Sequence, residues 1–89
     1  MGVYQRFEVS YKLNGQTYQT LVRIDRDMNP GGNHAQQSEH FRASIESSPL
    51  HGTASGRATT IDEALDYLNL SMQAAGADEI HFSTQPVGH

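Results

Sequence analysis

The chain has 89 residues, a formal net charge of -4 and no cysteine, so it predicts one small domain and excludes disulfides, thiolate catalysis and cysteine-based zinc sites. All the lysines and arginines lie within residues 1–57, whereas residues 58–89 carry acids and no lysine or arginine. Neither a signal peptide nor an apolar run of the roughly 20 residues that span a membrane is recognisable, and we expect a cytoplasmic protein that binds no membrane.

The N-terminal part of the chain predicts a β-hairpin. Apolar and polar residues alternate over residues 4–12, as in a strand with one buried face. Asn14-Gly15 follows, and this dipeptide favours a two-residue turn in which both residues have positive φ. Alternation resumes over residues 17–25, which predicts a returning strand.

The middle of the chain predicts a long loop and a third strand. Residues 26–39 contain Asn-Pro-Gly-Gly and have no periodicity, which is typical of a loop. Residues 40–47 alternate again and predict the third strand. The stretch that follows is irregular, with room for a short edge strand around Gly52 to Gly56.

A helix is predicted to begin after Thr60. Thr60 and Glu63 have the spacing of a capping box, and Gly76 is the expected stop. The apolar positions between them recur at helical spacing; they are Ile61, Ala64, Leu65, Leu68, Met72 and Ala75. Residues 79–84 predict a last short strand, and residues 85–89 a tail.

These elements predict a single α+β domain over residues 1–89. Its order is β-β-β-(β)-α-β. One helix cannot cover both faces of a sheet, so we expect an antiparallel sheet of three to five strands with one α-helix packed on one face.

The helix also carries a second, shorter apolar stripe. Because the first stripe serves the core, Tyr67, Leu70 and Ala74 are expected to face outward beside acidic residues. Exposed apolar residues rimmed by charge of one sign are typical of protein interfaces; the alternative is that Tyr67 and Leu70 only cover the margin of the core. The predicted partner-binding residues are Asp62, Asp66, Tyr67, Leu70, Ala74, Asp78 and Glu79.

The polar loops contain residues of two candidate kinds of ligand site. A phosphate loop is disfavoured, because Gly52 and Gly56 are too close together for that motif and Asp62 would repel an anion at the helix start. His34 and His40 flank a polar stretch, but their spacing matches no common zinc site. We therefore predict no cofactor and no metal.

A metal-binding module that uses His34 and His40 is one alternative to protein binding, and two further functions also compete with it. A small hydrolase would use His51 with a nearby serine, although no nucleophile motif surrounds them. Direct nucleic-acid binding would use Arg6, Arg23 and Arg42 on the outer sheet face, but glutamates interrupt them and the expected role is cross-strand pairing. We predict neither catalysis nor direct nucleic-acid binding.

The run from Phe41 to Met72 resembles the N-terminal domain of HicB-type antitoxins. That family shows a strand, a Pro-containing turn ending in Gly, a short strand ending in Gly, and a Thr cap before an amphipathic helix. The matching positions are Pro49, Gly52, Gly56, Thr60, Glu63, Ala64 and Leu65. The resemblance covers about a third of the chain and implies a module that neutralises a basic protein of the nucleic-acid-handling kind.

The size and charge are also similar to those of phage and mobile-element inhibitors of nuclease complexes, including anti-CRISPR proteins that mimic nucleic acid. Both interpretations predict that an acidic helix surface meets a basic partner, of toxin or nuclease type. An exposed strand edge would in addition permit a homodimer through sheet extension.

Overall fold

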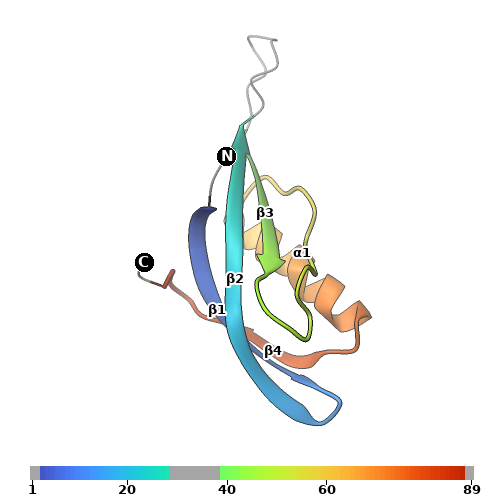
Figure 1. Ribbon diagram of the computed structural model, residues 1–89. Coiled ribbons are helices and arrows are strands. Elements are labelled where there is room, and N and C mark those ends of the chain that lie inside the picture. Colours follow the sequence, from blue (N-terminus) through green and yellow to red (C-terminus); the bar gives the residue numbers. More distant parts are fainter. Residues whose placement is uncertain (1–2, 29–38, 88–89) are drawn as a thin grey trace.

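Four antiparallel strands and one helix make up the computed structural model, which describes residues 3–28 and 39–87 (Figure 1). The elements are β1 (Val3–Leu13), β2 (Gln16–Met28), β3 (Glu39–Ile45), α1 (Ile61–Ala74) and β4 (Asp78–Phe82). The strands are ordered β3-β2-β1-β4 in the sheet, so the strand that follows the helix lies beside the first strand. The predicted α+β fold is confirmed.

The β1–β2 hairpin is closed by the predicted turn. Asn14 has φ 54° and Gly15 has φ 80°, the left-handed pair that a two-residue hairpin turn needs and that Asn-Gly adopts at little cost. This turn sets a register in which Tyr11 lies opposite Tyr18. Their rings stack with centroids 5.6 Å apart.

The core lies between one face of the sheet and α1, which crosses that face (Figure 1). From the helix, Ala64, Leu68 and Met72 are buried, and their spacing of four residues keeps them on one side of the helix. From the sheet, the buried side chains are Phe7, Val9, Tyr11, Val22, Ile24, Phe41, Ala43 and Ile45. Strand residues between these point to the opposite face, which no helix within residues 3–28 and 39–87 covers.

The start of α1 is capped by side chains on both sides of the boundary. Thr60 is the N-cap, and its hydroxyl accepts a hydrogen bond from the Glu63 backbone N–H at 3.0 Å. The Glu63 carboxylate returns to Thr59 and accepts from its backbone N–H at 2.8 Å. A capping box normally bonds the N-cap residue itself, so the reciprocal bond is displaced here by one residue.

The end of α1 is a Schellman turn. Gly76 has φ 102°, which lets the backbone N–H of Gly76 donate to the Gln73 carbonyl and that of Ala77 to the Met72 carbonyl, each at 3.0 Å. The predicted helix stop at Gly76 is confirmed, and the chain turns directly into β4.

The outer edge of β3 is covered by residues 53–58. Phe41 and Ala58 exchange backbone hydrogen bonds of 2.7 and 2.8 Å, and the Ser55 N–H donates to the Ala43 carbonyl at 2.8 Å. The short edge strand predicted around Gly52 to Gly56 is present here only as isolated bridges, one of which includes Ala54.

The C-terminal segment covers the part of β1 that β4 does not reach. The Ser83 N–H donates to the Glu8 carbonyl at 2.8 Å, and the Val87 N–H donates to the Arg6 carbonyl at 2.7 Å. The predicted tail, residues 85–89, is therefore attached to β1 at least as far as Val87; residues 88–89 lie outside the described residues.

The bounds predicted for the long loop were wrong at both ends. β2 continues to Met28 and β3 begins at Glu39, because Arg26 pairs with Phe41, and the next two residues of β2 also find partners on β3. Pairing across the sheet outweighs the local composition of residues 26–28. The central part of the predicted loop, residues 29–38, lies outside the described residues.

Candidate functional site

Four of the predicted partner-binding residues form one row along α1. Asp62, Asp66, Leu70 and Ala74 are spaced by four residues, so they lie one above the other on one helix face. All four are exposed. The row, called the α1 row below, is acidic in the first half of the helix and apolar in the second half.

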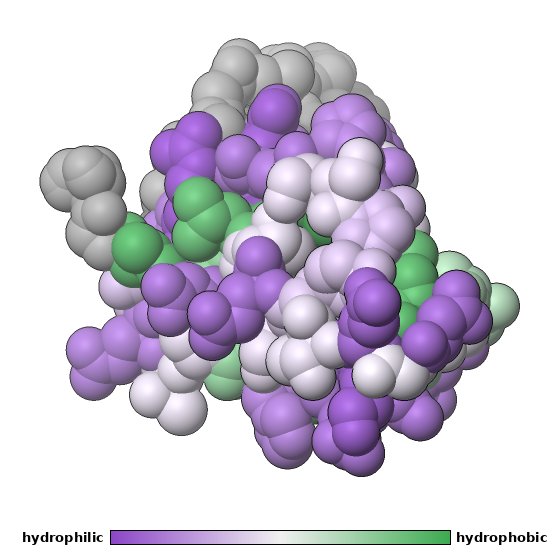
Figure 2. Space-filling view, turned by 60° about the horizontal axis from the view of Figure 1, so that its bottom comes forward, coloured by the Kyte–Doolittle hydropathy of each residue, from purple (hydrophilic) through white to green (hydrophobic). Residues whose placement is uncertain are grey.

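Tyr67 and Leu70 are the large hydrophobic side chains exposed in the described part of the chain. Leu70 is 62% exposed and Tyr67 is 40% exposed. At 3.6 residues per turn, Tyr67 lies beside Leu70 on the flank of the α1 row. Leu70 is therefore the more outward-facing of the two, and Tyr67 is more than half covered. The face drawn in Figure 2 is mainly hydrophilic or neutral, with hydrophobic colour confined to small separate areas.

The two remaining predicted residues, Asp78 and Glu79, lie at the start of β4. They line a shallow groove together with Asn69 and Gln73 of α1. Seen down the helix axis, Asn69 and Gln73 lie on the same side of Leu70 as Asp62 and Asp66. Tyr67 lies on the other side of Leu70. The acidic residues therefore border one side of the apolar pair and do not surround it.

Glu79 is held in an unusual backbone conformation. Its φ is 49°, in the left-handed region that residues other than glycine, asparagine and aspartate rarely adopt. The β1–β4 register shifts between Ser10 and Lys12, next to this position. The Glu79 carboxylate lies 3.6 Å from the Lys12 amine, with both side chains largely exposed, so this ion pair contributes little to stability.

Glu63 belongs to the helix cap and is not available to a partner. The pKa of its carboxyl is lowered, first by the hydrogen bond from the Thr59 backbone N–H and then by those from the Thr59 and Tyr67 hydroxyls. Hydrogen bonds to the charged form favour that form. The acidic half of the α1 row is therefore carried by Asp62 and Asp66.

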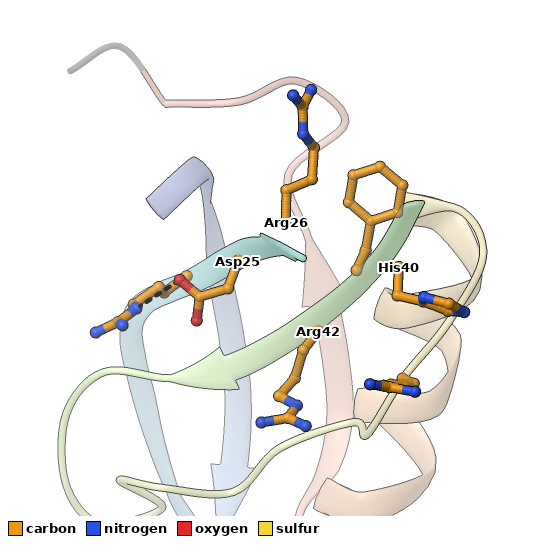
Figure 3. A pocket seen from close by; sticks show the side chains of 7 residues that line it. Asp25, Arg26, His40 and Arg42 are labelled. Carbon is orange, nitrogen blue, oxygen red and sulfur yellow. Dashed lines mark hydrogen bonds and ion pairs between the residues drawn. The ribbon is translucent and has the colours of Figure 1, made fainter. Parts of the chain in front are cut away.

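A second concentration of charge lies at the β2–β3 end of the sheet, and sequence reasoning missed it. A pocket there is lined by five basic side chains and one acid: Arg23, Arg26, His40, Arg42, Arg57 and Asp25 (Figure 3). It is called the arginine pocket below. One clue to this pocket was present in the sequence, which was the set of arginines predicted on the outer sheet face. Arg57 could not be placed with them, because it comes from a loop whose position depends on its pairing with β3.

Two ion pairs lie on the outer face of the sheet. The Arg6 Nε donates to the Glu46 carboxylate at 2.8 Å, as expected for cross-strand pairing with a glutamate. The Arg23 Nε donates to Asp25 at 3.2 Å, within the same strand. Of the three arginines predicted on this face, Arg6 lies opposite Arg23, whereas Arg42 lies opposite Asp25.

The hydroxyl groups near His51 have structural partners. The Ser47 hydroxyl bonds with the Thr20 hydroxyl, and the Ser55 hydroxyl donates to the Gly56 carbonyl at 2.7 Å. His51 itself is exposed, and no hydrogen bond joins it to a hydroxyl or carboxylate within residues 3–28 and 39–87.

No group of three or more potential metal ligands is assembled within the described ranges. His34, one of the two histidines weighed as ligands, lies outside them. No described helix is long and apolar enough to cross a membrane.

Comparisons of the chain with protein-family models, with curated proteins and with solved structures found no match.

Proposed function

We propose that the protein is a non-catalytic binding module, of inhibitor or antitoxin type, that contacts a basic protein partner through the outer face of α1. The observation that carries this proposal is the exposure of Leu70 and Tyr67 beside the acids of the α1 row. A large apolar side chain in water loses stabilisation that it would gain on burial, and a partner surface provides that burial.

The chemistry of the surface suggests how a partner would bind. Leu70 and Tyr67 would fill an apolar depression, with the aromatic ring as the stronger anchor. Asp62 and Asp66 would meet lysine or arginine at the rim, where charge mainly increases the association rate and is screened by salt. A toxin and a nuclease both present basic surfaces for nucleic acid, so this surface suits both partner classes expected from the sequence.

The size of the surface limits the role of α1. The helix α1 has 14 residues and is therefore about 21 Å long. One exposed face of so short a helix has too little surface for a stable interface, which buries about 800 Å² on each partner. The partner would therefore also contact a neighbouring element, and the groove beside Asp78 and Glu79 continues the acidic side of the α1 row.

The test begins with the identity of the partner. A photoreactive amino acid at Ala74 would cross-link the bound protein in source cells, and mass spectrometry would identify it. Binding of the purified partner would then be measured for Leu70→Ser and for Leu21→Ser, which makes the same chemical change on the outer face of β2. We expect Leu70→Ser to weaken binding about tenfold or more, in the range of an interface anchor, and Leu21→Ser to leave it unchanged.

The charge contribution has its own matched pair. Asp66→Lys should slow association, and more at low than at high salt, whereas Glu8→Lys on the uncovered sheet face should not. Equal effects of the two leucine variants, or of the two lysine variants, would show that the α1 surface is not the contact.

A further inference from the structure

The arginine pocket concentrates positive charge, although the whole chain is negatively charged. Four of the six lysine and arginine residues of the chain line it, together with one carboxylate. The whole chain has a net charge of -4. Cations that gather in one concavity repel each other, and this repulsion is relieved when an anion enters.

Backbone pairing brings the segments that carry two of these arginines together. Phe41 and Ala58 bond reciprocally, and Arg42 and Arg57 are the neighbours of this pair on the two antiparallel segments. Like charges on neighbouring strands are destabilising. His40 lies two residues before Arg42 on β3 and therefore extends from the same face of the sheet.

The carboxylate in the pocket is already engaged elsewhere. Asp25 accepts from Arg23 at 3.2 Å, and Figure 3 shows Arg42 extending away from Asp25 although the two are opposite in the strand register. No ion pair joins Arg42 or Arg57 to a carboxylate among the side chains that the structure describes. Both arginines are exposed, so their guanidinium groups are open to a ligand.

We propose that the arginine pocket binds a small oxyanion of the phosphate class, held between the guanidinium groups of Arg42 and Arg57 with His40 beside them. A guanidinium presents parallel N–H donors that match two oxygens of a phosphate, and two such groups from opposite sides satisfy most of its acceptors. The ligand is a free phosphate ion or the phosphate group of a small phosphomonoester.

The dimensions of the pocket favour a small ligand over a polynucleotide. Its volume of about 200 Å³ is below the roughly 300–1,000 Å³ typical of sites that enclose a whole organic ligand, so the pocket suits a small group.

The chain offers a matched control for the test. Inorganic phosphate would be titrated into the ¹⁵N-labelled protein at constant ionic strength, with sodium chloride as the compensating salt. The wild type would be compared with Arg42→Gln/Arg57→Gln and with Arg6→Gln/Lys12→Gln. The second variant loses the same charge from the two basic residues outside the pocket. Because Arg42 and Arg57 are exposed, we expect the double variant to fold, and circular dichroism would check this. If it does not fold, the single variant Arg57→Gln would replace it.

We expect saturable shifts at the backbone amides of residues 40–42 and 57, with a Kd of the order of 1 mM or lower. The pocket variant should weaken binding about tenfold or more, as for the loss of charge-assisted hydrogen bonds, and the control variant should match the wild type. Adenosine monophosphate in place of phosphate would separate the two sources: similar affinity indicates the bare ion, and tighter affinity a phosphomonoester.

Three results would overturn the proposal. The first is shifts that sodium chloride alone reproduces. The second is an equal loss of binding in the pocket variant and the control variant. The third is tighter binding of a single-stranded oligonucleotide than of phosphate, weakened equally by both double variants, which would indicate a diffuse nucleic-acid surface.

Discussion

The α1 row and the arginine pocket differ in shape, charge and construction. The α1 row is convex and acidic, has an apolar half, and comes from one helix. The arginine pocket is concave and basic, and it is assembled from β2, β3 and a loop residue. A chain with a modest net charge of -4 therefore has two surfaces of opposite sign, and its net charge describes neither of them.

This difference suggests a division between the two surfaces. A convex surface with exposed apolar side chains suits a macromolecule, whose own surface can close around it. A small concave site lined by several arginines suits a small anion. Because no residue belongs to both, substitutions in one should leave binding at the other unchanged.

The largest expected effect separates the two faces of α1. Leu68 is fully buried and Leu70 is 62% exposed, so the same change to alanine tests opposite sides of one helix. Leu68→Ala should lower the free energy of unfolding by about 2–5 kcal/mol because it leaves a cavity. Leu70→Ala should stay within about 0.5 kcal/mol of the wild type. Urea unfolding measures both, and a similar cost for the two would mean that Leu70 is packed in solution.

The next effect concerns the junction where the loop beside the arginine pocket meets α1. Thr60→Ala removes the hydroxyl that accepts from the Glu63 N–H, and loss of an N-cap costs about 1 kcal/mol. Thr60→Ser keeps the acceptor and should restore nearly all the stability. Thermal or urea unfolding of the pair would check this, and equal stability of the two variants would contradict the capping role.

A smaller effect tests whether the arginine pocket is strained by its own charge. Arg57→Gln removes one side of the Arg42–Arg57 pair, so without phosphate it should raise the free energy of unfolding by about 0.2–1 kcal/mol. High salt should reduce the gain, because these charges are exposed and screened. Urea unfolding at low and high sodium chloride gives the measurement. A loss of stability at low salt would show that Arg57 makes a net favourable contact.

The smallest effect is the pH dependence carried by Glu63. Its pKa lies below the ordinary value of 4.5 in the folded protein. Its contribution to stability is therefore fully present above pH 4.5 and is lost as the pH falls through the lower, folded pKa. Glu63→Gln should be less stable than the wild type at pH 7, and this difference should shrink toward pH 3. Unfolding of both proteins across this range is the check; a constant difference would mean that the carboxylate charge is not involved.

Local patterns were sufficient for the parts of the fold that depend on neighbouring residues. Asn14-Gly15 specified the hairpin, because few other residues accept two successive positive φ angles. Thr60 and Gly76 specified the helix ends through groups within one turn of the chain. The outward direction of Leu70 also followed from helical spacing alone.

The remaining features depend on pairing between distant segments. The ends of β2 and β3 were missed because the partners of residues 26–28 lie beyond the intervening loop. The arginine pocket was missed for the same reason. Arg57 and Arg42 line one pocket because Ala58 pairs with Phe41, and neither composition nor periodicity encodes that pairing.

The hydrogen bonds along the sheet edges bear on how the chain avoids aggregation. Residues 53–58 occupy the edge of β3, and Ser83 and Val87 occupy the stretch of β1 that β4 leaves open. The outer edge of β4 is short and carries charged residues, both features that discourage a second chain from adding a strand. Removal of the residues after Phe82 would expose the Arg6 and Glu8 carbonyls and create a docking edge for fibrillar assembly. The C-terminal segment thus occupies backbone carbonyls that an added strand would need, without being a strand itself.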